Sequence, residues 1–206
     1  MDSTSLITSF VTLFVIIDPI GLAPMFIALT KGADAAHRRA VALRACATGT
    51  AILLMFGLFG EAVLNFTGIS MPAFRIAGGI LLFLTAMDML FERRTARRKG
   101  QTSNADDPSV FPLATPLIAG PGAITSMILL TDKAPDTTAE IAVYLVMLSV
   151  IVLVLVFFLA STLIERLLGA IGVNVITRLL GMLLAALSVQ FVIDGLKGIG
   201  LVAAAG

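Results

Sequence analysis

The sequence contains very few of the residues from which disulfides and metal sites are built. It has a single cysteine, Cys46, and a single histidine, His37, among 206 residues. One cysteine allows no intramolecular disulfide. One histidine in a basic stretch, HRR, has no partner ligands in the pattern of a metal site. We therefore expect neither a bound metal nor a cofactor.

The same scarcity argues against an enzyme. An active site needs a nucleophile or an acid and base pair in one pocket. His37 stands alone in its basic stretch, and Cys46 lies near an expected helix start without a base beside it. We therefore expect no enzymatic activity.

Charged residues are also scarce, at 13% of the chain, while hydrophobic residues make up 58% and the mean hydropathy is +1.04. A soluble domain of this size cannot bury so much apolar surface. The net charge of +1 gives no indication of a nucleic-acid partner, so the expected partner is the lipid bilayer. We predict an all-α polytopic membrane protein, a single transmembrane domain over residues 1–206. Its six expected spans, each long enough to cross the hydrocarbon, are residues 5–29, 45–67, 74–90, 112–131, 141–164 and 176–197.

The basic residues are distributed unevenly between the two sides of such a bundle. If the spans alternate in direction, one side has only Arg75, Lys133 and Lys197 of the fourteen lysines and arginines. The other side carries the rest, which the positive-inside rule places in the cytoplasm. Both termini are then expected on the periplasmic, external face of the inner membrane. No lysine or arginine precedes Lys31, so the first span lacks the charged start of a signal peptide and is expected to stay in the mature protein.

The two halves of the chain resemble each other. IIDPIGLAPMF in the first half corresponds to IAGPGAITSMI in the second, which aligns Pro19 with Pro121, and further along Arg75 aligns with Arg178. We interpret residues 1–100 and 108–206 as two repeats joined by a linker at 101–107. Three spans per repeat is an odd number, so the second copy crosses in the opposite sense. A 3+3 inverted repeat of this kind is typical of secondary transporters.

The first span of each repeat contains helix breakers near its middle. Pro19 cannot continue a helix without a kink, and Asp18 before it is suited to cap a new helix whose first residue is the proline. Gly120, Pro121 and Gly122 make the corresponding break in the second repeat. We expect each break to lie at the bilayer midplane and to expose helix amides that attract an anionic group.

Asp18 is the one acidic residue expected near the midplane, where a charge is costly. It is a candidate to hold a substrate ammonium or a coupling proton or sodium ion, and a zwitterion would suit this combination. The alternative is that Asp18 only caps its helix. Both interpretations remain open from the residues alone.

Four stretches of the sequence together resemble the MarC family of membrane proteins. They are DPIGLAP in the first span, GISMPAFRIAGGILLF at 68–83, PLIAGPGAIT at 116–125 and VITRLLGMLLAALSVQFVIDGLKGI at 175–199. The resemblance covers nearly the whole chain. It implies six spans in an inverted repeat, and transport of small neutral amino acids such as glycine and alanine with proton coupling. This chain has Leu22 where a common form of the family motif has asparagine, so the resemblance defines the substrate less firmly than the fold.

Our hypothesis from the sequence is therefore a secondary transporter of small neutral amino acids in the bacterial inner membrane. A non-transporting membrane scaffold or sensor is the alternative, and the small-residue faces of the helices permit a homo-oligomer. The expected substrate site consists of Asp18, Pro19, Ile20, Gly21, Gly120, Pro121, Gly122, Ala123 and Thr125, with Asp18 also the candidate for ion coupling.

Overall fold

A computed structural model describes residues 3–91 and 108–201, and over these ranges the chain is helical, with no strand. The expected linker at 101–107 lies outside the described residues. The elements, in chain order, are α1 (Ser3–Ile17), α2 (Pro19–Leu29), α3 (Ala35–Thr67), α4 (Met71–Leu90), the irregular helical segment η1 (Ser109–Ile118), α6 (Pro121–Asp132), α7 (Thr137–Leu159) and α8 (Ser161–Gly198).

Within the described residues, five stretches are long and apolar enough to cross a membrane. They are Ser3–Leu29, Ala35–Thr67, Met71–Leu90, Thr137–Leu159 and Ile171–Gly198. The pair η1 and α6, bent by 54° between its two parts, makes a sixth if it is counted as one span. The prediction of an all-helical, polytopic membrane protein is confirmed at this level.

The fifth span ends earlier than expected. The prediction of a helix over 141–164 is wrong at its end, because α7 stops at Leu159 and a new helix begins at Ser161. Arg38 from the start of α3 donates a hydrogen bond of 3.1 Å to Ser161 Oγ, which ties the turn to a neighbouring helix. The backbone breaks again at Gly169 (φ 62°, ψ 173°), a conformation open essentially to glycine alone. Hydropathy does not detect such turns when they lie within a continuous apolar run.

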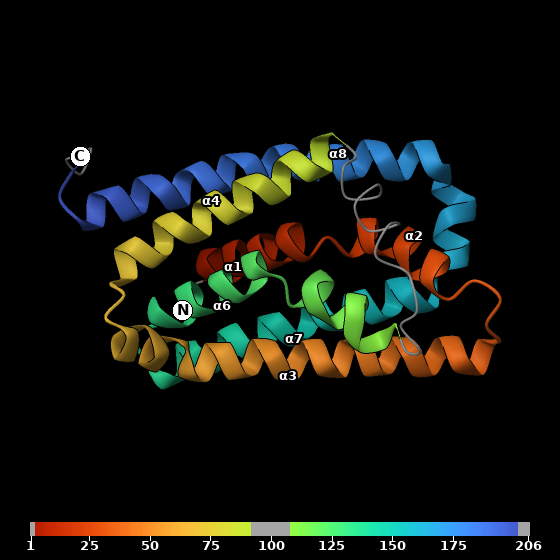
Figure 1. Ribbon diagram of the computed structural model, residues 1–206, viewed down its shortest axis with the longest axis horizontal. Helices are drawn as coiled ribbons and strands as arrows, with labels where there is room; N and C mark the ends of the chain where they lie inside the picture. Colours follow the sequence, from red (N-terminus) through yellow and green to blue (C-terminus); the bar gives the residue numbers. More distant parts are fainter. Residues whose placement is uncertain (1–2, 92–107, 202–206) are drawn as a thin grey trace.

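The helices run along the long axis of the molecule and define two ends (Figure 1). One end, called here the terminal end, carries the start of α1, the α3–α4 turn, the α6–α7 connection and the end of α8. The opposite end, called here the basic end, carries the α2–α3 connection with Lys31 and the α7–α8 turn. At the basic end the rings of Phe26 and Phe158 stack with centroids 4.6 Å apart, and the guanidinium of Arg38 lies 5.6 Å from the Phe26 ring centroid.

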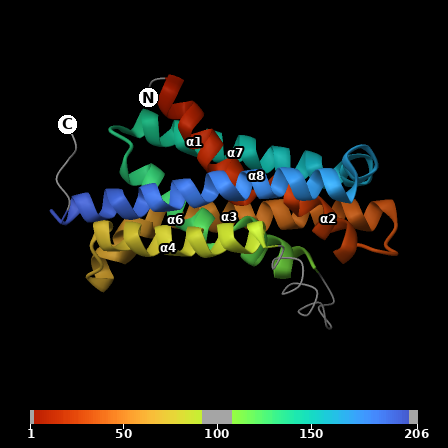
Figure 2. The same ribbon diagram turned by 90° about the horizontal axis from the view of Figure 1, so that it is seen from above.

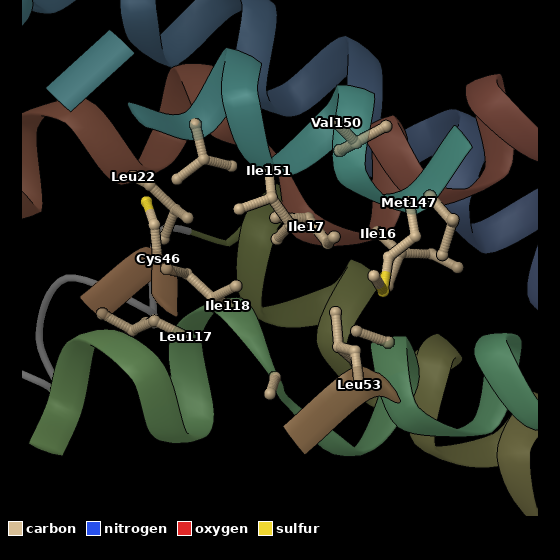
Figure 3. Packing of buried hydrophobic residues seen from close by; sticks show 14 of the residues in the cluster. Ile16, Ile17, Leu22, Cys46, Leu53, Leu117, Ile118, Met147, Val150 and Ile151 are labelled. Carbon is tan, nitrogen blue, oxygen red and sulfur yellow. The ribbon is translucent and has the colours of Figure 1, made fainter. Parts of the chain in front are cut away.

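The buried core surrounds the junction of α1 and α2. Figure 3 shows Ile17 and Leu22, from the two sides of this junction, among side chains of α3, η1 and α7. Ile17, Leu53 and Ile118 have no exposed surface. Between apolar helices in lipid, close van der Waals packing of this kind is what holds the elements together. The core thus places the α1–α2 junction deep inside the bundle.

Helices α4 and α8 form a long antiparallel pair, which lies along one side of the molecule (Figures 1 and 2). A Cβ at Gly79 of α4 would lie 2.8 Å from the Ser188 carbonyl oxygen of α8. A Cβ at Gly195 would lie 2.5 Å from Ile76 Cγ1 of α4. These contacts leave no room for larger side chains, so the glycines allow the two backbones to approach closely.

Candidate functional site

Asp18 joins α1 to α2 and is fully buried. Its backbone N–H donates to the Phe14 carbonyl oxygen at 2.9 Å, which completes α1, and its carbonyl oxygen accepts from the Leu22 N–H at 3.0 Å, which starts α2. Its backbone is left-handed (φ 55°, ψ 64°), a conformation that aspartate tolerates better than most residues. The interpretation of Asp18 as an N-cap is confirmed, because its Oδ1 accepts a hydrogen bond of 3.0 Å from the Gly21 N–H.

This cap uses most of the donors at the start of α2. Pro19 has no N–H, and the Gly21 and Leu22 amides donate to Asp18. Of the first four residues, these bonds leave the Ile20 N–H for another acceptor. The start of α2 therefore carries a negative side chain and one remaining amide.

The second break, between η1 and α6, is built differently. Gly120 has an extended backbone (φ −80°, ψ 168°) and makes no side-chain cap, and α6 begins at Pro121. The Ile124 N–H donates to the Gly120 carbonyl oxygen at 2.9 Å. The amides of Gly122 and Ala123 are consequently not capped by the preceding residue. The start of α6 is a positive helix end without a negative side chain of its own.

The first turn of α6 packs against the last turn of α1. A Cβ added to Gly122 would lie 3.4 Å from Ile16 Cγ2 of α1 and 2.5 Å from Leu82 Cδ2 of α4. Ile16 is two residues before Asp18, so the two breaks lie in the same part of the bundle, near the middle of its long axis (Figure 1). The structure thus brings the end of α1 and the start of α6 into one region.

The residues predicted for the site differ in their exposure. Pro19, Gly120, Gly122 and Ala123 are buried with Asp18, Ile20 and Gly21 are half-buried, and Pro121 is exposed. Thr125 is also buried, and its methyl carbon packs directly over Gly78 of α4. Thr125 therefore marks a contact between α6 and α4.

Sequence reasoning missed two polar features near this region. Ser126 is fully buried, and its hydroxyl has no hydrogen-bond partner among the described residues. Arg75 of α4 forms an ion pair with Asp132 at the end of α6, with 3.6 Å between Nη2 and Oδ2. Asp132 is a single acid after an apolar run, and nothing in the sequence indicates that Arg75 is its partner. No group of three or more His, Cys, Asp or Glu suited to a metal occurs in the described part of the chain.

Comparisons with known proteins agree on one relationship. The model of a family described as MarC family integral membrane protein matches residues 3–200. A UPF0056 membrane protein of Methanocaldococcus jannaschii is 38% identical over 203 residues, which cover 96% of this chain and 98% of the relative. In Escherichia coli, the UPF0056 membrane protein YhcE is 36% identical over 196 residues (92% and 91%), and the UPF0056 inner membrane protein YhgN is 32% identical over 192 residues (93% and 96%). No solved structure matches.

Proposed function

We propose that this chain, which belongs to the MarC family of integral membrane proteins, is a secondary transporter of small neutral amino acids such as glycine and alanine. Transport is coupled to a proton or a sodium ion. The membrane is the bacterial inner membrane, a placement supported by the name of the relative YhgN. No enzymatic step is part of this proposal.

The packing of the helices supports an inverted repeat, in which each half interlocks with the other. Helix α3 of the first half packs against η1 and α6 of the second, and α7 of the second half packs against α1 and α2 of the first. In the same way α4 packs against α6, and α8 against α2. The contacts of α3 with η1 and α6 therefore correspond to those of α7 with α1 and α2, and the contact of α4 with α6 corresponds to that of α8 with α2. In secondary transporters, binding sites lie where such repeats meet.

The observation that carries the proposal is the pairing of a buried carboxylate with an uncapped helix start. Asp18 is fully buried beside the start of α2, and α6 begins nearby without a side-chain cap. An amino acid carries a carboxylate and an ammonium group, which need opposite partners. The amides of Gly122 and Ala123 would bind the carboxylate, and Asp18 would bind the ammonium group or the coupling ion.

The surroundings of the two breaks suit a small, neutral side chain. Ile16, Leu22 and Leu82 are buried apolar residues around this region. A Cβ at Gly122 would already meet two of them, which limits the volume for a ligand. A large substrate side chain would have to displace these apolar residues. A charged one would be buried without a partner, at a high cost in free energy.

The proposed orientation of the protein in the membrane follows from the distribution of its basic residues. The basic end carries Lys31, Arg38 and Arg39, and the positive-inside rule favours the cytoplasm for this end. Both termini then lie on the periplasmic side. Rocking of one repeat against the other would expose the region of the breaks to each side in turn.

Uptake by purified protein in proteoliposomes tests this proposal. We expect saturable uptake of radiolabelled glycine and alanine that an imposed pH or sodium gradient accelerates. Asp18→Asn keeps a residue that caps helices and tolerates the left-handed backbone, so only the charge is lost. We expect uptake to fall by about tenfold or more, equivalent to about 1.4 kcal/mol or more.

The matched control is Asp34→Asn. Asp34 is also an aspartate N-cap, which accepts from the His37 N–H at 2.7 Å, but it is exposed at the basic end. This variant should transport like the wild type. Transport that survives Asp18→Asn would reduce Asp18 to a cap, and no transport of either solute by folded wild-type protein would favour the scaffold or sensor.

A further inference from the structure

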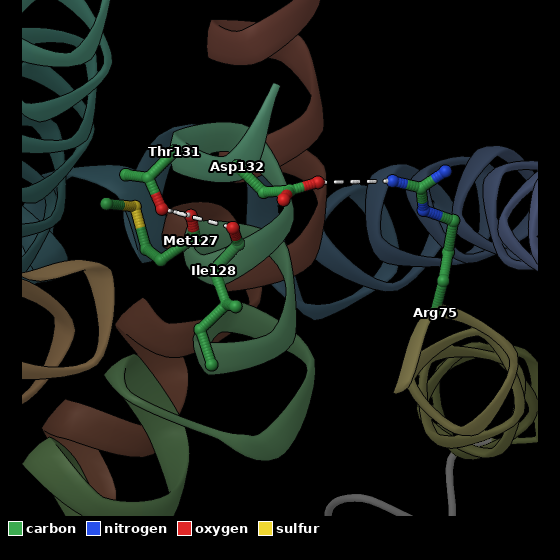
Figure 4. Close-up of polar contacts among 5 residues, drawn as sticks. All are labelled: Arg75, Met127, Ile128, Thr131 and Asp132. Carbon is green, nitrogen blue, oxygen red and sulfur yellow. Dashed lines mark hydrogen bonds and ion pairs between the residues drawn. The ribbon is translucent and has the colours of Figure 1, made fainter. Parts of the chain in front are cut away.

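Helices α4 and α6 meet along a seam, defined here by three levels of contact. At the first level Arg75 pairs with Asp132 (Figure 4). At the second, Gly78 packs against the methyl of Thr125. At the third, Leu82 packs against Gly122. As the numbers rise along α4 they fall along α6, so the two helices are antiparallel at the seam.

The seam connects the terminal end to the second break. Asp132 is the last residue of α6 and Gly122 is its second, so the contacts run the length of this helix. The three α4 residues are spaced three and four apart, which places them on one face of the helix. The seam therefore covers the side of α6 that leads from the terminal end to its uncapped start.

We propose that the α4–α6 seam is the gate on the terminal-end side of the candidate site, and that the Arg75–Asp132 ion pair is its latch. This inference rests on the proposed function, because it concerns access to that site. Separation of α4 from α6 would open a path between water and the start of α6. When the seam is closed, water on the terminal-end side does not reach the start of α6 along it.

The chemistry of the seam suits a contact that opens and closes. The Arg75 and Asp132 side chains are 18% and 28% exposed, so water reaches the pair and its strength is modest. Arg75 Nε is buried and has no hydrogen-bond partner among the described residues. Movement into water would provide that partner, which offsets part of the cost of breaking the pair. Below the latch, the contacts of Gly78 and Gly122 join apolar atoms.

The opposite end of the bundle is held by different chemistry. Thr30 stands eleven residues after Pro19, as Asp132 stands eleven after Pro121. The Thr30 hydroxyl donates to the Phe26 carbonyl oxygen at 2.7 Å, within its own segment, and Phe26 stacks on Phe158. The end of α2 thus has an aromatic contact where the end of α6 has an ionic one. Substitutions of Arg75 or Asp132 should consequently act on the terminal end, since the charged contact at the basic end, Arg38 over Phe26, belongs to other residues.

Thiol labelling tests the gate without requiring transport. In a Cys46→Ser background, Thr125→Cys places a thiol inside the seam, at a position that is 3% exposed. A membrane-impermeant thiol reagent is applied to right-side-out and to inverted vesicles. Because the labelling rate follows the open population, Asp132→Asn should raise it about threefold or more, and only from the side that the terminal end faces.

The reversed pair Arg75→Asp/Asp132→Arg restores the attraction and should return the rate toward that of the parent. The matched control is Asp194→Asn, because Asp194 accepts from Gln190 Nε2 at 2.7 Å within α8 and, among the residues the structure describes, forms no hydrogen bond or ion pair with a second helix. The parent protein in 1 M NaCl, where the Debye length is about 3 Å, should also label faster, and this measurement needs no change in the latch.

An unchanged rate in both Asp132→Asn and high salt would overturn the latch. Faster labelling from the side of the basic end would overturn the gate. Uptake is measured separately with Thr125 intact, in the Cys46→Ser protein. Labelling of Thr125→Cys as expected, together with no uptake by the protein that keeps Thr125, would contradict the proposed function and leave the seam in place as a moving contact.

Discussion

The two helix breaks share a proline at the start of the new helix but differ in the electrostatics of the residue before it. Each new helix starts with a proline, Pro19 in α2 and Pro121 in α6. Before the first proline stands Asp18, with a left-handed backbone and a carboxylate that caps the helix. Before the second stands Gly120, extended and without a cap. One break therefore presents a negative group, and the other presents bare amides.

The glycines explain why the breaks differ. A Cβ at Gly21 would overlap the Asp18 carboxylate, so this glycine makes room for the cap. A Cβ at Gly120 would lie 2.5 Å from the Pro116 carbonyl oxygen, so no side chain fits at the capping position of the second break. At the first break, Gly21 makes room for the capping side chain of Asp18. At the second break, Gly120 itself occupies the capping position. The position of one glycine decides which helix start lacks a side-chain cap.

The largest effect on stability is expected from Gly120→Ala. Pro116 O is a backbone atom and cannot rotate away, so we expect a loss of about 1–3 kcal/mol in the free energy of unfolding, as for overpacked cores. Cys46 is buried and is the one cysteine of the sequence, so a thiol-reactive fluorophore reports unfolding on heating. The midpoint temperature should fall well below that of the wild type, and Gly120→Asp should fall further because it also buries a charge. An unchanged midpoint in Gly120→Ala would mean that η1 yields readily at this point.

A smaller effect is expected from Gly21→Ala at the first break. The added methyl displaces the Asp18 carboxylate from the Gly21 N–H and costs about 1 kcal/mol, the usual value of an N-cap. Uptake should fall as well, because the carboxylate moves.

A double-mutant cycle with Asp18→Ala sharpens this test. Once the carboxylate is removed, the new methyl has nothing to displace, so the combined loss should be smaller than the sum by about 0.5 kcal/mol or more. Strict additivity would show that Gly21 is constrained by something other than Asp18.

The sequence was sufficient to predict the membrane class, the helical fold and the cap at Asp18. Hydropathy responds to long apolar runs, and the order Asp-Pro-x-Gly has a local physical meaning that packing did not overturn. The inverted repeat and its role in transport stay predictions, now supported by the pattern of contacts between the halves.

The remaining features depend on contacts between distant residues. The turn after Leu159 lies within an apolar run and is tied by Arg38, more than a hundred residues earlier in the chain. The ion pair of Arg75 with Asp132 likewise joins α4 and α6, and no local sequence pattern predicts that these two helices are in contact. Thr125 stays a predicted substrate contact, and the packing of its methyl on Gly78 could not be predicted, because the face that a residue presents depends on how its helix is rotated in the bundle.

The last comparison sets the two prolines side by side, and one of its two variants is expected to have no measurable effect. Pro19→Ala and Pro121→Ala each add one N–H at the first position of a helix, where proline is favourable but not required. Pro19 is buried and Pro121 is exposed. The new amide at residue 19 is enclosed by protein and costs about 1 kcal/mol or more if it finds no partner there, whereas residue 121 lies at the protein surface and is less constrained by packing.

We therefore expect the midpoint temperature of Pro19→Ala to fall measurably and that of Pro121→Ala to stay within error of the wild type, in the same Cys46 assay. Equal losses would mean that both starts are enclosed to the same degree, and the contrast between a closed, charged break and an open, neutral one would have to be given up. A larger loss at Pro121 would reverse it and would make α6 the more rigidly held of the two helix starts.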